Sequence, residues 1–188
     1  MKRIDAIHAL LQMLDRQPVL SNLGANTYDL YAAADRQENF YMWGAMGSVS
    51  SIGLGLALAR PDLRVIVLDG DGSLLMNLGS LATISTQRPV NLVHIVFDNR
   101  MYETTGGQPT HTAAGINLAS IARAAGLPAV REASDLKSFG DAALAALREP
   151  GPWFILATVE PGTSTAQIPR RPVCYKDRFM SGIEKAQR

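Results

Sequence analysis

The chain has almost no net charge and only one cysteine. Its 18 Lys and Arg residues nearly cancel its 17 Asp and Glu residues, which leaves a formal charge of +1. This balance gives no reason to expect nucleic acid or an anionic membrane as a partner. Cys174 cannot form a disulfide within the chain, which favours a reducing compartment, and we expect the cytoplasm.

Long apolar runs are absent as well. No stretch approaches the ~20 apolar residues of a membrane-spanning helix. The first 17 residues carry two early positive charges, but Asp5, His8 and Asp15 interrupt any apolar run. We therefore expect an amphipathic helix there rather than a signal peptide.

The chain does contain short apolar segments that alternate with helical patterns. Its 188 residues are 47% hydrophobic and 19% charged, which suits a single domain, 1–188, with a polar C-terminal tail from about residue 161. Strands are expected at 18–22, 40–43, 64–68, 91–97, 128–131 and 153–159, with helices within 1–17, 27–34, 44–61, 74–86, 117–125, 136–148 and 176–186. This order predicts an α/β fold, a doubly wound, mainly parallel sheet with helices on both faces that binds ligands at the carboxyl ends of its strands.

A glycine-rich turn stands where the third strand passes into a helix. Residues 65–68 are apolar, and Asp69-Gly70-Asp71-Gly72 follows them directly. A turn of this kind at a helix start can hold phosphate. Because 26 residues separate Gly72 from Asn99 at the end of the next strand, Asp71 and Asn99 can meet at one edge of a parallel sheet. Their oxygens suit magnesium, although Asp-Gly is also among the commonest turn dipeptides.

Another glycine pattern, Gly53-Leu54-Gly55, invites comparison with a dinucleotide-binding fingerprint. Leu58 stands where that fingerprint has its third glycine, and the pattern lies inside a helical stretch rather than directly after a strand. We therefore set aside a nicotinamide or flavin site of the Rossmann type.

The strand, the Gly70-Asp71-Gly72 turn, the helix and the strand ending in Asp98-Asn99 have the spacing of the thiamine diphosphate motif, which usually ends in two asparagines. The likeness extends over nearly the whole chain. The segments SNLGANTYDLY, NFYMWGAMGSVSSIGLGLALA, VIVLDGDGSLLMNLGSLATI, VFDNRMYETTGGQPTHT and IPRRPVCYKDRFM resemble the β subunits of sulfopyruvate decarboxylases. They are similar, somewhat less closely, to the matching domain of phosphonopyruvate decarboxylases.

The resemblance implies which residues hold the cofactor. Asp71 and Asn99 would bind Mg²⁺ through their side chains, and Met101 through its backbone carbonyl. The backbone amides of Ser73 and Leu74 would meet the diphosphate at a helix start, where unpaired N–H groups favour anions. In full, the residues expected to contact thiamine diphosphate are Asn22, Gly44, Ala45, Met46, Gly70, Asp71, Gly72, Ser73, Leu74, Asn99, Met101 and Tyr102.

At the other end of the cofactor, the resemblance assigns Gly44 a carbonyl contact to the aminopyrimidine. It makes Met46 the bulky residue that props the cofactor in its bent form. From the residues alone, a methionine among small helical residues is more often core packing. The pair Arg100-Met101 departs from the family, whose members usually have a small pair beginning with glycine, so Arg100 could contact or clash with something in the site.

Met46, Glu103 and His111 are the residues for which we predict a catalytic role. His111 lies in a loop expected at 100–115, where it could orient substrate or move a proton; a solvated loop histidine is an equal alternative. His94, inside an apolar strand, is expected to be a satisfied core residue. Arg170 and Arg171 could bind a substrate sulfonate or carboxylate, but the preferred interpretation is a polar tail before a terminal helix.

The resemblance implies decarboxylation of a small 2-oxo acid, here 3-sulfopyruvate to sulfoacetaldehyde and CO2. In the family, the glutamate that activates the cofactor comes from a separate pyrimidine-binding domain, and none of the six glutamates here lies in a segment resembling that domain. We therefore hypothesise an α subunit that carries the pyrimidine-binding domain and the activating glutamate. The alternatives are a phosphonopyruvate decarboxylase subunit, another thiamine diphosphate-dependent decarboxylase or ligase of 2-oxo acids, and a noncatalytic regulatory subunit.

Overall fold

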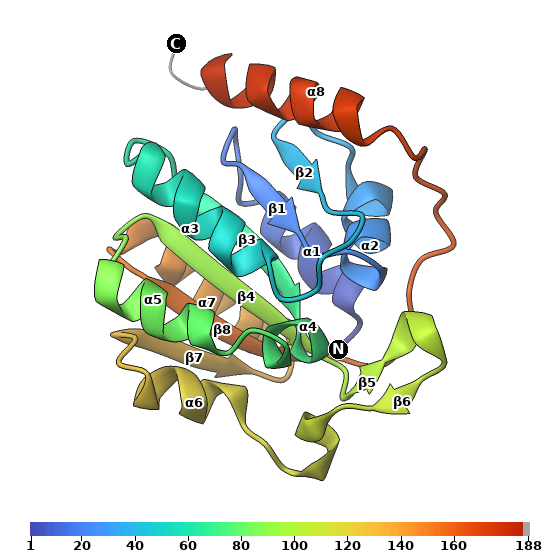
Figure 1. The fold of residues 1–188 in the computed structure, drawn as a ribbon, viewed down its shortest axis with the longest axis vertical. Coiled ribbons are helices and arrows are strands. Elements are labelled where there is room, and N and C mark those ends of the chain that lie inside the picture. Colours follow the sequence, from blue (N-terminus) through green and yellow to red (C-terminus); the bar gives the residue numbers. More distant parts are fainter. Residues whose placement is uncertain (186–188) are drawn as a thin grey trace.

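The fold is that of a computed structural model, which describes residues 1–185 and is organised around one parallel sheet (Figure 1). Six strands run parallel in the spatial order β2-β1-β3-β4-β8-β7. They are β1 (Val19–Ser21), β2 (Asn39–Tyr41), β3 (Val65–Gly70), β4 (Leu92–Asp98), β7 (Ala129–Ala133) and β8 (Trp153–Thr158). The central strands β3 and β4 are buried, apart from the half-buried Gly70 at the end of β3, because helices cover both faces of the sheet. The predicted doubly wound α/β fold is therefore confirmed.

Two hydrophobic cores lie on the two faces of the sheet. The first core contains the apolar sides of α1 (Arg3–Leu11), α2 (Ala25–Ala33) and α7 (Leu136–Arg148). The second core contains those of α3 (Val49–Ala59), α5 (Gly79–Gln87) and α6 (Leu118–Ala124). The terminal helix α8 (Pro172–Lys185) packs at the β2 edge of the sheet (Figure 1).

Small residues let α3 approach the sheet closely, as its composition suggests. A Cβ atom added to Gly53 would lie 2.2 Å from Cγ2 of Val67 on β3. Even alanine at position 53 would therefore push the helix away from the strand.

The predicted helix at 74–86 is wrong as a continuous element. It is divided into α4 (Asp71–Leu75) and α5, with residues 76–78 between them. The backbone amides of Met76 and Asn77 bond to carbonyls three residues earlier, and Asn77 Nδ2 donates to the carbonyl of Gly47 at 2.8 Å. The apolar pattern of residues 74–86 continues across the break, so it does not predict it. The contact between Asn77 and Gly47 joins residues 30 positions apart, which a local pattern does not report.

Two other predicted segments have more structure than expected. The loop at 100–115 contains a short hairpin, β5 (Met101–Tyr102) with β6 (Gln108–Pro109), and the 3-10 turns η1 (Glu103–Thr105) and η2 (His111–Ala114). The helix predicted at 176–186 begins earlier, at Pro172, and residue 186 lies outside the described residues. No helix within residues 1–185 is long and apolar enough to cross a membrane.

The strand order places a crevice between β1 and β3. From β1 the chain moves outward to β2, then returns to the other side of β1 as β3. Connections that diverge in this way leave space at the carboxyl ends of the two strands, where α/β proteins commonly bind ligands.

Candidate functional site

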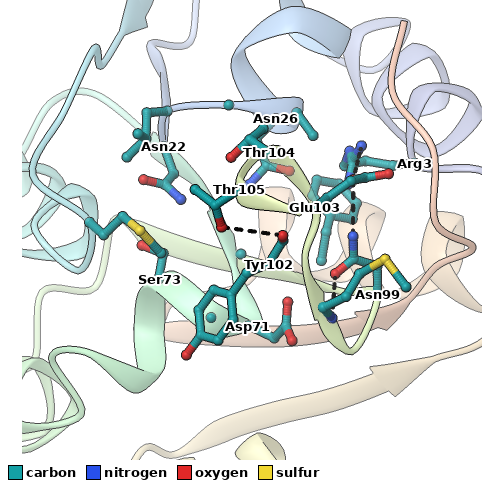
Figure 2. A pocket seen from close by; sticks show the side chains of 18 residues that line it. Arg3, Asn22, Asn26, Asp71, Ser73, Asn99, Tyr102, Glu103, Thr104 and Thr105 are labelled. Carbon is teal, nitrogen blue, oxygen red and sulfur yellow. Dashed lines mark hydrogen bonds and ion pairs between the residues drawn. The ribbon is translucent and has the colours of Figure 1, made fainter. Parts of the chain in front are cut away.

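A pocket opens at this crevice, and residues that directly follow three strands line it. Asn22 follows β1, Asp71 follows β3, and Asn99 follows β4; Figure 2 shows the three side chains around one space. Nine of the twelve predicted cofactor residues line the pocket: Asn22, Met46, Gly70, Asp71, Gly72, Ser73, Asn99, Met101 and Tyr102. The other three, Gly44, Ala45 and Leu74, do not.

Asp71 is a buried carboxylate at the first residue of α4. Its Oδ2 accepts hydrogen bonds from the hydroxyls of Thr110 at 2.6 Å and Thr112 at 3.1 Å. Burial raises the pKa of Asp71 to about 6; the hydrogen bond from Thr110 opposes this shift, and the charge of Asp98 adds to it. A cation beside Asp71 would favour the ionised carboxylate, so this corner of the pocket suits a hard metal ion.

Asp98 holds the following loop against Asp71. Its Oδ1 accepts from the hydroxyl of Thr112 at 2.8 Å and from the backbone amide of Arg100 at 3.0 Å. Arg100 has φ 64°, in the left-handed region where glycine is least strained. This backbone conformation is a physical reason for a glycine at that position in the resembling family, and the contact with Asp98 helps to hold the arginine in it.

Asn99 is oriented by a chain of contacts that reaches the N-terminal helix. Its Oδ1 accepts from the backbone amide of Met101 at 3.1 Å, and its Nδ2 donates to Glu103 Oε2 at 3.0 Å. The same Glu103 oxygen lies 3.3 Å from Nη2 of the buried Arg3, whose Nε donates to Asp29 at 2.8 Å. These contacts settle which end of the Asn99 amide is nitrogen and leave its oxygen facing away from Glu103.

The sequence analysis did not identify Arg3 as a site residue. It lines the pocket with Glu103 (Figure 2). Its guanidinium also donates to the carbonyl of Gly162, whose amide donates to Glu103. No local pattern identifies such a residue, because its partners lie 26, 100 and 159 residues away.

The loop that carries Met46 is attached to α4. The amide of Gly47 donates to Ser73 Oγ at 2.9 Å, and its carbonyl accepts from Asn77 at 2.8 Å. Gly47 has φ 83°, and an added Cβ would lie 2.8 Å from Cβ of Asn77. Met46 is half-buried and lines the pocket, and it belongs to neither hydrophobic core. The alternative of core packing is therefore not supported for Met46.

Two asparagines line one side of the pocket, Asn22 directly after β1 and Asn26 in α2. Asn22 and Asn26 are buried, and Oδ1 of Asn22 has no hydrogen-bond partner among residues 1–185. Across the pocket, Tyr102 covers Gly72 so closely that an added Cβ would lie 2.4 Å from its ring. Glycine at 72 is therefore required by the tyrosine as well as by the turn.

The predictions for His111 and His94 have different outcomes. His111 is exposed and does not line the pocket, so the chain does not bring it to the cofactor residues. His94 is fully buried, with Nε2 3.2 Å from Oδ2 of the buried Asp69. Its Nδ1 has no partner within the described part of the chain, so the expectation of a satisfied core histidine is correct for only one ring nitrogen.

Comparison with known proteins agrees with this geometry. Residues 22–157 match the family described as thiamine pyrophosphate enzyme, C-terminal TPP binding domain, and the chain belongs to that family. Within it, the chain groups with the sulfopyruvate decarboxylase β subunits: it is 43% identical to "Sulfopyruvate decarboxylase subunit beta" of Methanocaldococcus jannaschii over 98% of each chain.

Two longer proteins also resemble this chain, one in sequence and one in fold. The chain is 44% identical to a phosphonopyruvate decarboxylase of Streptomyces viridochromogenes over 86% of its own length, but it spans only 40% of that protein. The crystal structure of benzoylformate decarboxylase from Polynucleobacter necessarius superposes with a TM-score of 0.73 at 15% identity, covering 87% of this chain and 34% of that one. At this identity the likeness concerns the fold alone.

Proposed function

We propose that the chain is the β subunit of a thiamine diphosphate-dependent decarboxylase that converts 3-sulfopyruvate to sulfoacetaldehyde and CO2. The observation that carries this proposal is the meeting of Asp71 and Asn99 in one pocket, in a chain that is 43% identical to a sulfopyruvate decarboxylase β subunit over nearly its full length. The exposed, unpaired Cys174 supports a reducing compartment, in keeping with the cytoplasm.

The residues present fit the cofactor's diphosphate and a magnesium ion. Among residues 1–185 no group of three or more His, Cys, Asp and Glu could hold a metal, so a magnesium site needs amide and backbone oxygens beside Asp71. Asn99 and the carbonyl of Met101 would supply them, which is the donor set that a hard cation prefers. The unpartnered Oδ1 of Asn22 marks the pocket as a polar site that a ligand can complete.

When bound, thiamine diphosphate supplies the electron sink for loss of CO2 from a 2-oxo acid. This chain's residues hold and shape it. Asp71 and Asn99 secure the metal end, the start of α4 offers backbone N–H groups to the diphosphate, and Met46 supports the ring end. Tyr102 excludes water on the side of Gly72. Glu103 positions Asn99, and His111 remains a candidate for contact with substrate only if the partner closes over it.

The activating carboxylate is assigned to a separate α subunit. Glu103 is the only glutamate among the residues that line the pocket, and its carboxylate already accepts from Asn99, Arg3 and the amide of Gly162. Both of its oxygens are therefore engaged by donors of this chain. The chain also spans only 40% of the phosphonopyruvate decarboxylase that it matches, which leaves room in that protein for a second domain.

The decisive experiment measures decarboxylation of 3-sulfopyruvate by the purified chain, by a candidate α subunit with a pyrimidine-binding domain, and by the two together. We expect turnover only from the mixture, and only with thiamine diphosphate and Mg²⁺. Full activity of this chain alone would contradict the two-subunit proposal. A strong preference of the mixture for phosphonopyruvate would make that substrate the correct assignment; the chain is also 44% identical to a phosphonopyruvate decarboxylase.

A further inference from the structure

A second pocket shares a wall with the cofactor pocket. Leu23, Gly24 and Thr104 line both, and the second pocket continues between Met42, Trp43 and Arg170. Cγ2 of Thr104 would lie 3.0 Å from a Cβ added to Gly24, so contact between these two residues forms the wall. The two pockets therefore adjoin at these residues, and a small molecule at the junction lies beside the groups that line both.

The second pocket has one charged lining residue, Arg170. Its guanidinium makes no hydrogen bond or ion pair with any residue in the described range 1–185. By contrast, Arg178 on α8 donates twice to Asp35, at 2.8 and 2.6 Å. Trp43 lines the same pocket, and its indole N–H is a buried donor that also has no partner in this part of the chain. The pocket thus combines an available cation with neutral polar and aromatic groups.

We propose that this pocket is the subsite for the sulfonate of the substrate, with Arg170 as its cationic partner. This inference rests on the proposed function, because it assigns one end of a 3-sulfo-2-oxo acid. In such a substrate a single methylene separates the carbonyl carbon from the sulfonate, so the proposal places the reacting carbon where the two pockets adjoin at Gly24 and Thr104. The planar guanidinium can donate two parallel hydrogen bonds to an oxyanion.

The charge of the pocket favours a sulfonate over a phosphonate. A sulfonate carries one negative charge, which one guanidinium compensates. A phosphoryl group carries about 1.5 to 2 negative charges at neutral pH, and this pocket has no second cation among its lining residues. A phosphonate would therefore keep part of its charge uncompensated in this pocket, whereas a sulfonate would not.

The test uses the assembled two-subunit enzyme with Arg170→Gln, Arg170→Lys and the matched control Arg171→Gln, whose side chain is exposed and outside the pocket. Arg170→Gln should raise the KM for 3-sulfopyruvate at least about tenfold, because an ionic hydrogen-bonded contact is lost. Arg170→Lys should restore part of the loss, and Arg171→Gln should change KM less than about twofold. The constant for plain pyruvate, measured as KM or as an inhibition constant, should be unchanged by all three.

A second measurement does not depend on turnover. The chain has two tryptophans, Trp43 in the pocket and Trp153 in the core. Titration of 3-sulfopyruvate into the cofactor-free complex should change tryptophan fluorescence. Trp43→Phe should remove the response, and Arg170→Gln should weaken the apparent affinity at least about tenfold.

Three results would overturn the subsite. They are an unchanged KM in Arg170→Gln, an equal loss for pyruvate and 3-sulfopyruvate, and an equal rise in KM for 3-sulfopyruvate in Arg170→Gln and the control Arg171→Gln. Failure of the wild-type complex to decarboxylate any 2-oxo acid would instead overturn the proposed function. In that case the fluorescence titration still decides whether Arg170 binds the sulfonate.

Discussion

The two ends of the cofactor pocket differ in how fully this chain builds them. At the ends of β3 and β4, Asp71 and Asp98 are buried and share the hydroxyl of Thr112. Beyond Met46, by contrast, Gly44 and Ala45 are exposed, and in the neighbouring pocket the guanidinium of Arg170 forms no hydrogen bond or ion pair with any residue in the range 1–185. Under the proposed function, this difference predicts that this chain holds the diphosphate and metal, and that substrate and a partner subunit complete the reacting end.

Removing the Asp71 carboxylate should have the largest effect, a loss of cofactor affinity. Asp71→Ala should weaken magnesium-dependent binding of thiamine diphosphate at least about 1,000-fold, or about 4 kcal/mol, because a charged ligand is lost. Isothermal titration of the cofactor with and without Mg²⁺ measures this.

Asp141→Ala is the matched control, since Asp141 is an exposed carboxylate in a surface ion pair with Lys137. It should leave cofactor binding unchanged. If Asp71→Ala binds as tightly as wild type, the assignment of the metal site is wrong.

A second break targets the buried network behind the metal end. Arg3→Met leaves the carboxylates of Asp29 and Glu103 without their cation, which should lower the free energy of unfolding by about 3 kcal/mol. Urea denaturation measures the loss. Because Glu103 orients Asn99, the variant should also bind Mg²⁺ more weakly at temperatures where it is folded.

Lys137→Met is the control for this network, since it removes an exposed helical ion pair and should cost less than about 0.5 kcal/mol. Adding Glu103→Gln to Arg3→Met should recover part of the lost stability, since one uncompensated charge is removed. Equal losses in Arg3→Met and Lys137→Met would mean that the buried network does not stabilise the fold.

Substitution of Met46 should change the catalytic rate rather than the stability of the fold. Met46→Ala should lower kcat of the two-subunit enzyme about tenfold, because a poorly supported cofactor ring is misplaced relative to the substrate. Steady-state kinetics measures the change in kcat, and titration with thiamine diphosphate measures any change in cofactor affinity. The cofactor affinity should change little.

Met76→Ala provides the comparison for Met46, because Met76 is 58% exposed and does not line the pocket. It should leave kcat within about twofold of wild type. A loss of stability rather than of rate in Met46→Ala would return Met46 to a packing role.

The smallest effect concerns the pH dependence of stability in chelator, without cofactor. The pKa of Asp71 is raised from 3.8 to about 6 by burial, so the folded state binds a proton more tightly than the unfolded state. The stabilising contribution of this proton is fully present below pH 4 and is lost as the pH rises through 6. From pH 7 to pH 5, wild type should therefore gain about 1 kcal/mol relative to Asp71→Asn.

Urea denaturation of both proteins at several pH values measures this difference. If the free energy of unfolding of wild type and Asp71→Asn changes equally with pH, then burial does not raise the pKa of Asp71.

The sequence determined the order of the elements and the positions of the strand ends. Apolar runs such as 65–68 and the glycines at 70 and 72 are local features, so they predict a buried strand and a turn without knowledge of the rest of the chain. The spacing between Asp71 and Asn99 likewise follows from one helix and one strand. Asp71 and Asn99 could therefore be placed at one edge of the sheet beforehand. The other predicted cofactor residues were expected from the resemblance to the family, and nine of the twelve line the pocket.

Only the tertiary structure determined which side chains support these residues. Arg3 meets Glu103 across 100 residues, and Asp29 accepts from the amide of Ser164 across 135. The break between α4 and α5 and the approach of Arg170 to Trp43 depend on contacts of the same kind. Local periodicity reports which face of an element is buried. The partner of a buried charge or of a loop residue depends on how distant segments pack, and that is fixed only when the whole chain folds.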